Sequence, residues 1–147
     1  MKKLSTMKDV LDFAISGESK AAELYTTMAA TAENPWMRKM LEGFAEEEMQ
    51  HHNKLKAVRE GRNALVRECI ADLGIADKLD DVEPHPDMNY PELLVFAIKK
   101  ENTSHGLYKR LASVFTEPEL QETFLALAEQ EAEHKRRFEM EYESLTS

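Results

Sequence analysis

The sequence repeats itself at a fixed offset of 83 residues. Between residues 11 and 51, 13 of 41 positions hold the same residue as the position 83 further along the chain. Phe13-Ala14-Ile15 returns as Phe96-Ala97-Ile98, and Pro35 returns as Pro118. A gapless internal repeat of this length predicts that the two halves fold alike and are related by an approximate two-fold axis.

Four long helices are predicted, two in each half, because apolar residues recur at steps of three and four. The expected ranges are 6–31, 35–60, 90–115 and 118–145. Proline follows the first and third helices and ends each of them, and Gly61 is expected to cap the second. The connector, about residues 61–89, is long enough to run back along a bundle. The pattern predicts one all-α domain over residues 1–147, a four-helix bundle of two helical hairpins joined by a long crossover.

Charge and cysteine content narrow the function classes. The 147 residues carry a net charge of -9, which argues against binding nucleic acid through its phosphates. No apolar run reaches the roughly 20 residues that a membrane span needs, and no signal peptide is recognisable. Cys69 is the single cysteine, so an internal disulfide and a four-cysteine metal site are excluded. These features favour a cytoplasmic location.

The repeated polar residues are a Glu on the apolar face of one helix and a Glu-x-x-His on the next. Residues three apart on a helix project from the same side, and a carboxylate on an apolar face is costly to bury unless it is paired or bound to metal. Four carboxylates would balance two divalent ions. Iron or manganese suits this oxygen and nitrogen set, and zinc can occupy it too. The alternative is that these glutamates lie on solvated helix faces. The six candidate metal ligands are Glu18, Glu48, His51, Glu101, Glu131 and His134.

Other residues on the same faces are candidate neighbours of this site. Tyr25 and Tyr108 each lie seven residues past a candidate Glu, on the same helix face. They are catalytic candidates that hydrogen-bond ligand carboxylates or act as redox-active neighbours of the metals, or they are core tyrosines with hydrogen-bonded hydroxyls. His105 lies one turn past Glu101 and is a seventh ligand, a proton carrier or a hydrogen-bonded core histidine.

Three more residues are expected outside the site. His52 is predicted to point away from the metal ligands and to lie at the surface. His85, in the connector, is also predicted to be a surface residue. Trp36 is expected to pack at one end of the bundle.

With these residues placed, the chain resembles the rubrerythrin branch of the ferritin-like superfamily. The matching segments are FAISGESKAAELY, FAEEEMQHHNKL, FAIKKENTSHGLY and LAEQEAEHKRRF. The resemblance covers nearly the whole chain. It implies a ferritin-like four-helix bundle with a di-iron centre and, commonly, reduction of peroxide as part of the response to oxidative stress.

Two departures from the family pattern affect the expected function. Rubrerythrins proper carry a C-terminal rubredoxin domain with four cysteines, which this sequence lacks, so its electrons would come from an external donor protein such as a rubredoxin. Rubrerythrins also usually carry an extra Glu three residues after the third-helix ligand. Ser104 stands there, which puts rubrerythrin-like peroxidase chemistry in doubt, although His105 is a candidate partial substitute.

Three functions are compatible with these residues. The first is a di-iron oxidoreductase that reduces hydrogen peroxide or dioxygen. The second is an iron-binding or ferroxidase protein for iron handling without sustained peroxide turnover. The third is a structural dimer in which buried Glu and His side chains pair with one another. A homodimer is expected, with exchange of hairpins between subunits as one arrangement.

Overall fold

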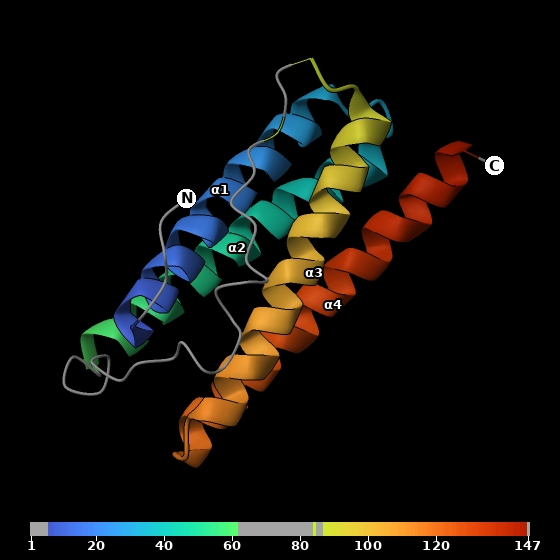
Figure 1. Cartoon of the computed structure of the whole chain (residues 1–147). Helices are drawn as coiled ribbons and strands as arrows, with labels where there is room; N and C mark the ends of the chain where they lie inside the picture. The colour runs from blue at the N-terminus through green and yellow to red at the C-terminus, as the bar shows by residue number, and fades with distance from the viewer. Residues whose placement is uncertain (1–5, 62–83, 85–86, 147) are drawn as a thin grey trace. The chain divides into compact units, whose positions relative to one another are not determined.

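The structure is a computed structural model that describes residues 6–61, 84 and 87–146. Four helices make up this part of the chain (Figure 1): α1 (Met7–Thr31), α2 (Pro35–Gly61), α3 (Tyr90–Val114) and α4 (Pro118–Thr146). The predicted helices are confirmed to within one residue at every end. Most of the predicted crossover, with Cys69 and His85, lies outside the described residues.

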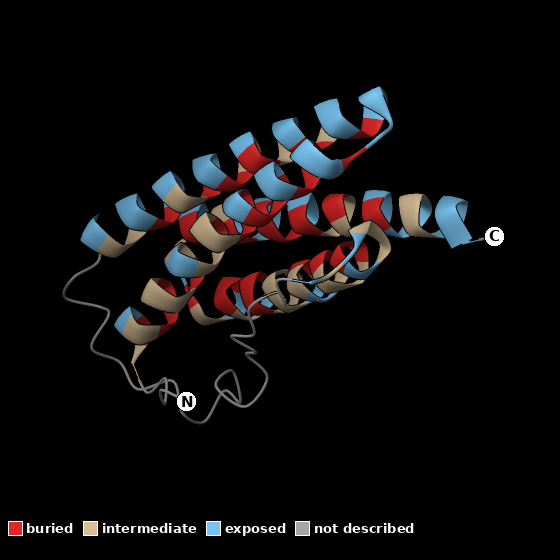
Figure 2. Cartoon of the chain, turned by 90° about the horizontal axis from the view of Figure 1, so that it is seen from above, coloured by how far each residue is buried: buried red, intermediate tan, exposed pale blue. Residues whose placement is uncertain are grey.

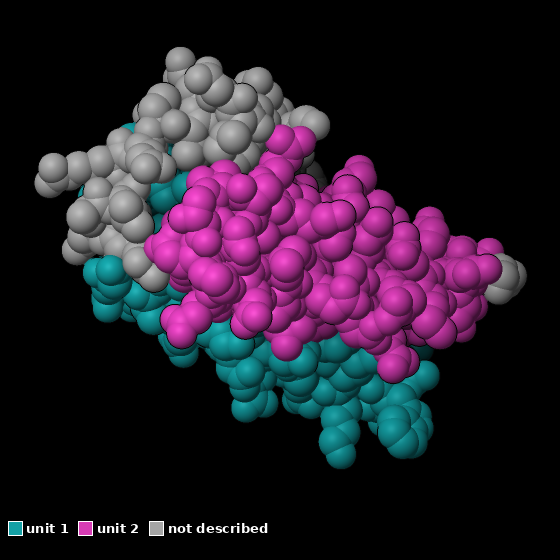
Figure 3. Space-filling model, turned by 90° about the horizontal axis from the view of Figure 1, so that it is seen from below, with its two compact units in different colours: residues 1–79 teal, residues 80–147 magenta. Residues whose placement is uncertain are grey.

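The chain divides into two compact units, Met1–Leu79 and Asp80–Ser147 (Figure 3). The first unit contains the hairpin of α1 and α2, and the second contains the hairpin of α3 and α4. Each hairpin corresponds to one copy of the sequence repeat. The prediction that both hairpins belong to one domain stays a prediction.

Side-chain caps determine where α1 and α3 begin. The Thr6 hydroxyl accepts a hydrogen bond from the backbone N–H of Asp9 at 3.1 Å. Asn89 and Glu92 form a reciprocal capping box in which each side chain accepts the other's backbone N–H at 3.0 Å. These bonds satisfy N–H groups that the first turn of a helix leaves without a partner, and Pro91 in the first turn of α3 has no N–H to satisfy.

The two hairpin turns are stabilised by side chains that occupy equivalent positions in the repeat. Arg38 donates from Nε to the carbonyl of Ala29 at 3.2 Å and from its guanidinium to the carbonyl of Ala32 at 2.8 Å. Gln121, 83 residues later, donates from Nε2 to the carbonyl of Phe115 at 2.7 Å. Both side chains satisfy carbonyls at the end of the preceding helix, which has no following turn to bond them.

Buried residues recur along one side of each helix (Figure 2). In the first unit the most buried apolar residues are Val10, Leu11, Tyr25, Met28, Leu41 and Leu55. In the second they are Leu94, Ala97, Tyr108, Leu111, Phe124 and Phe138. The spacing is that of an amphipathic helix.

The second hairpin packs aromatic rings at its turn where the first has smaller residues. The rings of Phe115 and Phe124 are stacked with centroids 5.3 Å apart. The equivalent residues of the first hairpin are Ala32 and Leu41.

Trp36 lies at the start of α2 and is 84% exposed, so the prediction that it packs at a bundle end is wrong. Asn34 accepts its backbone N–H at 2.8 Å, which holds the backbone at the turn while the indole projects into solvent.

No helix within residues 6–61 and 87–146 is both long enough and apolar enough to cross a lipid bilayer.

Candidate metal centre

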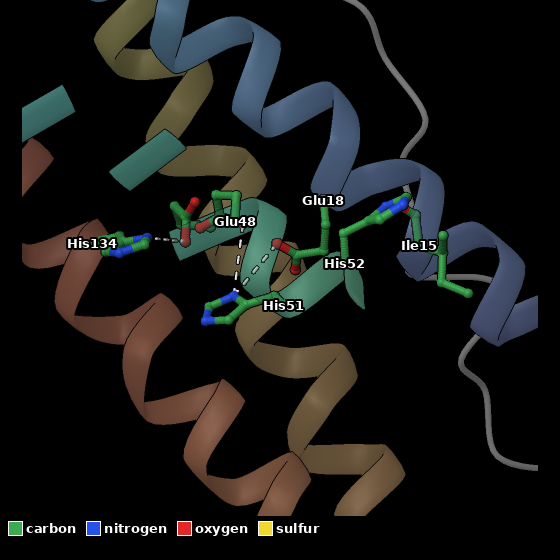
Figure 4. Close-up of polar contacts among 7 residues, drawn as sticks. Ile15, Glu18, Glu48, His51, His52 and His134 are labelled. Carbon is green, nitrogen blue, oxygen red and sulfur yellow. Dashed lines mark hydrogen bonds and ion pairs between the residues drawn. The ribbon is translucent and has the colours of Figure 1, made fainter. Parts of the chain in front are cut away.

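The first hairpin brings together Glu18, Glu48 and His51, which we call the first triad. Glu18 comes from the middle of α1, and Glu48 and His51 come from α2. His51 Nδ1 lies 3.5 Å from Glu18 Oε2 and 3.9 Å from Glu48 Oε2 (Figure 4). One ligand atom from each of the three residues lies within 4.8 Å of the other two. All three side chains are at most 2% exposed.

The second hairpin brings together Glu101, Glu131 and His134, the second triad. Glu101 comes from α3, and the other two residues come from α4. His134 Nδ1 lies 3.7 Å from Glu101 Oε2, the counterpart of the His51–Glu18 contact. One ligand atom from each residue again lies within 4.8 Å of the other two, and none is more than 2% exposed. The repeat in sequence is therefore also a repeat in side-chain geometry.

Each triad has a charge and a donor set that suit a divalent cation. Two carboxylates face one imidazole, so a triad whose two carboxylates are both ionised has a net negative charge even with a protonated imidazole. Burying such a charge is costly unless a cation offsets it. Carboxylate oxygens with an imidazole nitrogen are ligands that iron, manganese and zinc accept. The residues present therefore fit a metal, and the interpretation of the six residues as ligands stays a prediction.

His52 lies next to the first triad and packs against α1. Its Nδ1 contacts the carbonyl oxygen of Ile15 at 3.0 Å, and the residue is half-buried. His52 does point away from His51 (Figure 4), but the prediction that it is a surface residue is wrong. The partner is a backbone carbonyl, which every residue has, so nothing in the sequence indicates that His52 contacts Ile15.

His105 makes a contact of the same kind in the second hairpin. Its Nδ1 lies 2.8 Å from the carbonyl oxygen of Ala128, and the residue is half-buried between α3 and α4. This contact engages one ring nitrogen with the backbone. Whether the other nitrogen serves as a metal ligand or a proton carrier stays a prediction.

Tyr25 and Tyr108 are buried, at 0% and 1% exposure. Tyr108 packs against Phe124, with ring centroids 6.2 Å apart. Their proposed catalytic role stays a prediction. Ser104, at the place of the family's extra Glu, is half-buried on α3.

Comparison with known proteins identifies the family. The family model described as Rubrerythrin matches residues 9–71 and 92–147, which include both triads. No curated protein matches the chain. A solved structure of a hypothetical protein from Pyrococcus furiosus is similar, with 21% identity, a TM-score of 0.73, and coverage of 93% of this chain and 88% of that one.

A second similar structure is that of CopM in its Cu(I)-bound form, with 11% identity, a TM-score of 0.73, and coverage of 97% of this chain and 99% of that one. At these identities, the two likenesses show the fold alone. The predicted fold class, an all-α ferritin-like four-helix bundle, is confirmed. With buried Glu and His clusters that are compatible with a di-iron site, the chain belongs to the rubrerythrin family.

Proposed function

We propose that this protein is a di-iron carboxylate oxidoreductase that reduces hydrogen peroxide or dioxygen with electrons from an external donor protein. The observation that carries the proposal is the buried Glu-Glu-His triad in each hairpin of a rubrerythrin family member. We further propose that each triad holds one metal ion, which gives two metal ions per chain. The two carboxylates of a triad would offset the two positive charges of a divalent ion, so each filled site would be neutral.

Each residue type would have its own role. Glu18, Glu48 and His51 would hold one metal, and Glu101, Glu131 and His134 would hold the other, with each histidine contributing a ring nitrogen and each glutamate its carboxylate oxygens. When bound, two iron(II) ions supply the two electrons that cleave the O–O bond of hydrogen peroxide. The side chains of the triads exclude bulk water, since none is more than 2% exposed. Tyr25 and Tyr108 would donate hydrogen bonds from their hydroxyls to ligand carboxylates.

The reaction balances with two protons and two electrons for each peroxide, yielding two waters. The electrons would come from a donor such as a rubredoxin. The similar structure of CopM contains copper(I), but we propose iron for this protein. Copper(I) favours thiolate and thioether ligands, whereas the triads offer carboxylates and imidazole. Manganese and zinc remain compatible with the same ligands.

Metal analysis and peroxide kinetics test this proposal together. The anaerobically purified protein is expected to contain about two irons per chain and to consume peroxide repeatedly when a reduced donor is supplied. Glu48→Ala and Glu131→Ala are expected to lower this consumption by at least about tenfold. Glu46→Ala and Glu129→Ala are matched controls, because both residues are exposed, lie two positions before those glutamates and are related by the repeat. Undiminished iron-dependent turnover in Glu48→Ala and Glu131→Ala would refute the proposal.

A second candidate is an iron-binding or ferroxidase protein that does not turn over peroxide. Ser104 favours it, because the rubrerythrin pattern has a further carboxylate at that place. Stoichiometric oxidation of bound iron(II), with no sustained peroxide consumption in the presence of reduced donor, would support this function over the first.

A further inference from the structure

Each hairpin contains a histidine side chain that reaches the backbone of the opposite helix. His52 of α2 contacts the Ile15 carbonyl of α1 at 3.0 Å, and His105 of α3 contacts the Ala128 carbonyl of α4 at 2.8 Å. Because a carbonyl oxygen can only accept, Nδ1 of each ring must carry the proton. Nδ1 carries it in both the neutral and the charged ring, so protonation does not break either bond.

The two carbonyls occupy the same place relative to the triads. Ile15 lies three residues before Glu18, and Ala128 lies three residues before Glu131. Each bond therefore ties the opposite helix one turn before a triad carboxylate. Each histidine also lies within about one turn of a triad residue on its own helix. The bonds thus join the helices beside the triads and not at the hairpin turns.

The position of one helix along the other matters for a site built from both. A helix rises 1.5 Å per residue, whereas metal–ligand distances are expected to hold within about 0.2 Å. The first triad takes Glu18 from α1 and His51 from α2, so a small axial shift between the helices would move one donor away from the other. Packing of side-chain ridges into grooves sets the overall axial alignment of two helices, but apolar contacts are not directional and do not hold an individual donor to a fraction of an ångström. A hydrogen bond to a fixed backbone atom is directional.

We propose that His52 and His105 are positioning residues that fix the axial alignment of α1 with α2 and of α3 with α4, so that triad donors from different helices stay in place for metal. This inference rests on the proposed metal centre. Neither residue needs to touch the metal.

The repeat supplies an independent argument. At the offset of 83 residues, His52 corresponds to Lys135 and His105 corresponds to Ala22. The first hairpin takes its histidine from the Glu-x-x-His helix, and the second takes it from the other helix. The two bonds are therefore not copies of one ancestral contact. The two hairpins thus use histidines at unrelated positions to form the same kind of hydrogen bond, each to a carbonyl one turn before a triad Glu.

Cobalt(II) binding to the full-length protein tests the proposal without any turnover. Its affinity and visible absorption bands report the ligand arrangement. His52→Ala and His105→Ala are expected to weaken binding about tenfold and to alter the bands. His52→Asn and His105→Asn are expected to restore both, because the Asn amide nitrogen lies close to where Nδ1 stood and can donate the same bond.

Gln121→Ala is the matched control. It removes another bond from a side chain to a carbonyl, that of Phe115 at 2.7 Å, at the hairpin turn. It is expected to lower the melting temperature of the metal-free protein and to leave cobalt affinity unchanged. Where an alanine variant does not fold, the leucine variant, which keeps bulk without a donor, takes its place against the asparagine variant.

The outcomes separate the two proposals. If the wild-type protein binds no cobalt(II), the metal centre itself is refuted, and the positioning role with it. If the wild-type protein binds cobalt(II) and the histidine variants bind it equally well, only the positioning role is overturned. The positioning role is also overturned if the asparagine variants do not restore the cobalt affinity and visible bands that the alanine or leucine variants lose.

Discussion

Glu48→Gln is expected to change thermal stability in opposite directions in the metal-free and metal-loaded protein. Glu48 is 0% exposed, and its neighbour His51, at 3.9 Å, also faces Glu18, at 3.5 Å. One imidazole thus faces two buried carboxylates, so the charges within the triad do not balance when both carboxylates are ionised. Glutamine keeps the size of the side chain and one acceptor oxygen, replaces the other oxygen by an NH2 donor, and removes one negative charge.

The expected size follows from the burial of this charge. Replacing a buried ion pair or triad by uncharged residues of similar volume is often neutral or stabilises a protein by about 1–4 kcal/mol. Because His51 still faces Glu18 at 3.5 Å in Glu48→Gln, no charge loses its only partner, and we take about 2 kcal/mol for Glu48. For a chain of this length, about 2 kcal/mol raises the melting temperature by about 4–8 °C. The wild-type protein, in contrast, gains about 2.7 kcal/mol for each site when free metal is at 100 times its Kd. Glu48→Gln should lose most of this gain.

Thermal unfolding followed by circular dichroism, with chelator and then with iron(II) under anaerobic conditions, measures both effects. Glu46→Gln is the control, because Glu46 is exposed on the same helix and should change neither melting temperature. A lower melting temperature of metal-free Glu48→Gln, with no response of the wild type to metal, would refute the reasoning. That result would support the structural alternative, in which buried Glu and His side chains stabilise the fold by pairing with one another.

Two further predictions concern the second hairpin. Phe124→Ala should destabilise the protein by about 3–5 kcal/mol in chemical denaturation, because its buried ring stacks on Phe115, whereas Leu125→Ala, at a position 53% exposed, should change stability by at most about 0.5 kcal/mol; equal effects would contradict the packing. Burial and the neighbouring Glu141 carboxylate, which accepts the Tyr90 hydroxyl at 3.1 Å, raise the pKa of Tyr90 well above its usual value. Because the pKa of Tyr90 is higher in the folded than in the unfolded protein, the contribution of protonated Tyr90 to folding stability is complete below the unfolded pKa of about 10. It is lost as pH rises above that value, because the tyrosine ionises more easily in the unfolded chain. Tyr90→Phe should reduce this alkaline loss in unfolding measured from pH 8 to 11, and an unchanged profile would contradict the assignment.

The helices and the candidate ligands could be predicted from the sequence because both depend on local spacing. Proline residues and cap residues, such as Asn89 before α3, mark helix ends within a few positions. Glu48 and His51 share a helix face whatever the rest of the chain does, since they are three residues apart. Gly61 shows the limit of such rules, because it is the last residue of α2 and not the cap beyond it.

Contacts between side chains and distant backbone could not be predicted in the same way. His52 was expected at the surface, but it bonds the Ile15 carbonyl, 37 positions away in sequence. Trp36 is predicted to pack at a bundle end because it directly follows Asn34-Pro35, but it is exposed beside the turn held by Asn34. The exposure of Trp36 depends on the direction of the chain at the turn, and the contact of His52 depends on how α2 lies along α1. Residue type encodes neither of these.

The repeat, the helices and the residue types of the two triads were therefore evident in the sequence, since each follows from periodicity along one chain segment. The structure was needed to establish that Glu18 contacts His51 and that Glu101 contacts His134. It was also needed to show that His52 and His105, which have no histidine counterpart in the repeat, contact the backbone of the opposite helix. The physical reason is that these contacts depend on the axial alignment of one helix against another. That alignment arises from packing over the whole helix pair, and no short segment of sequence specifies it.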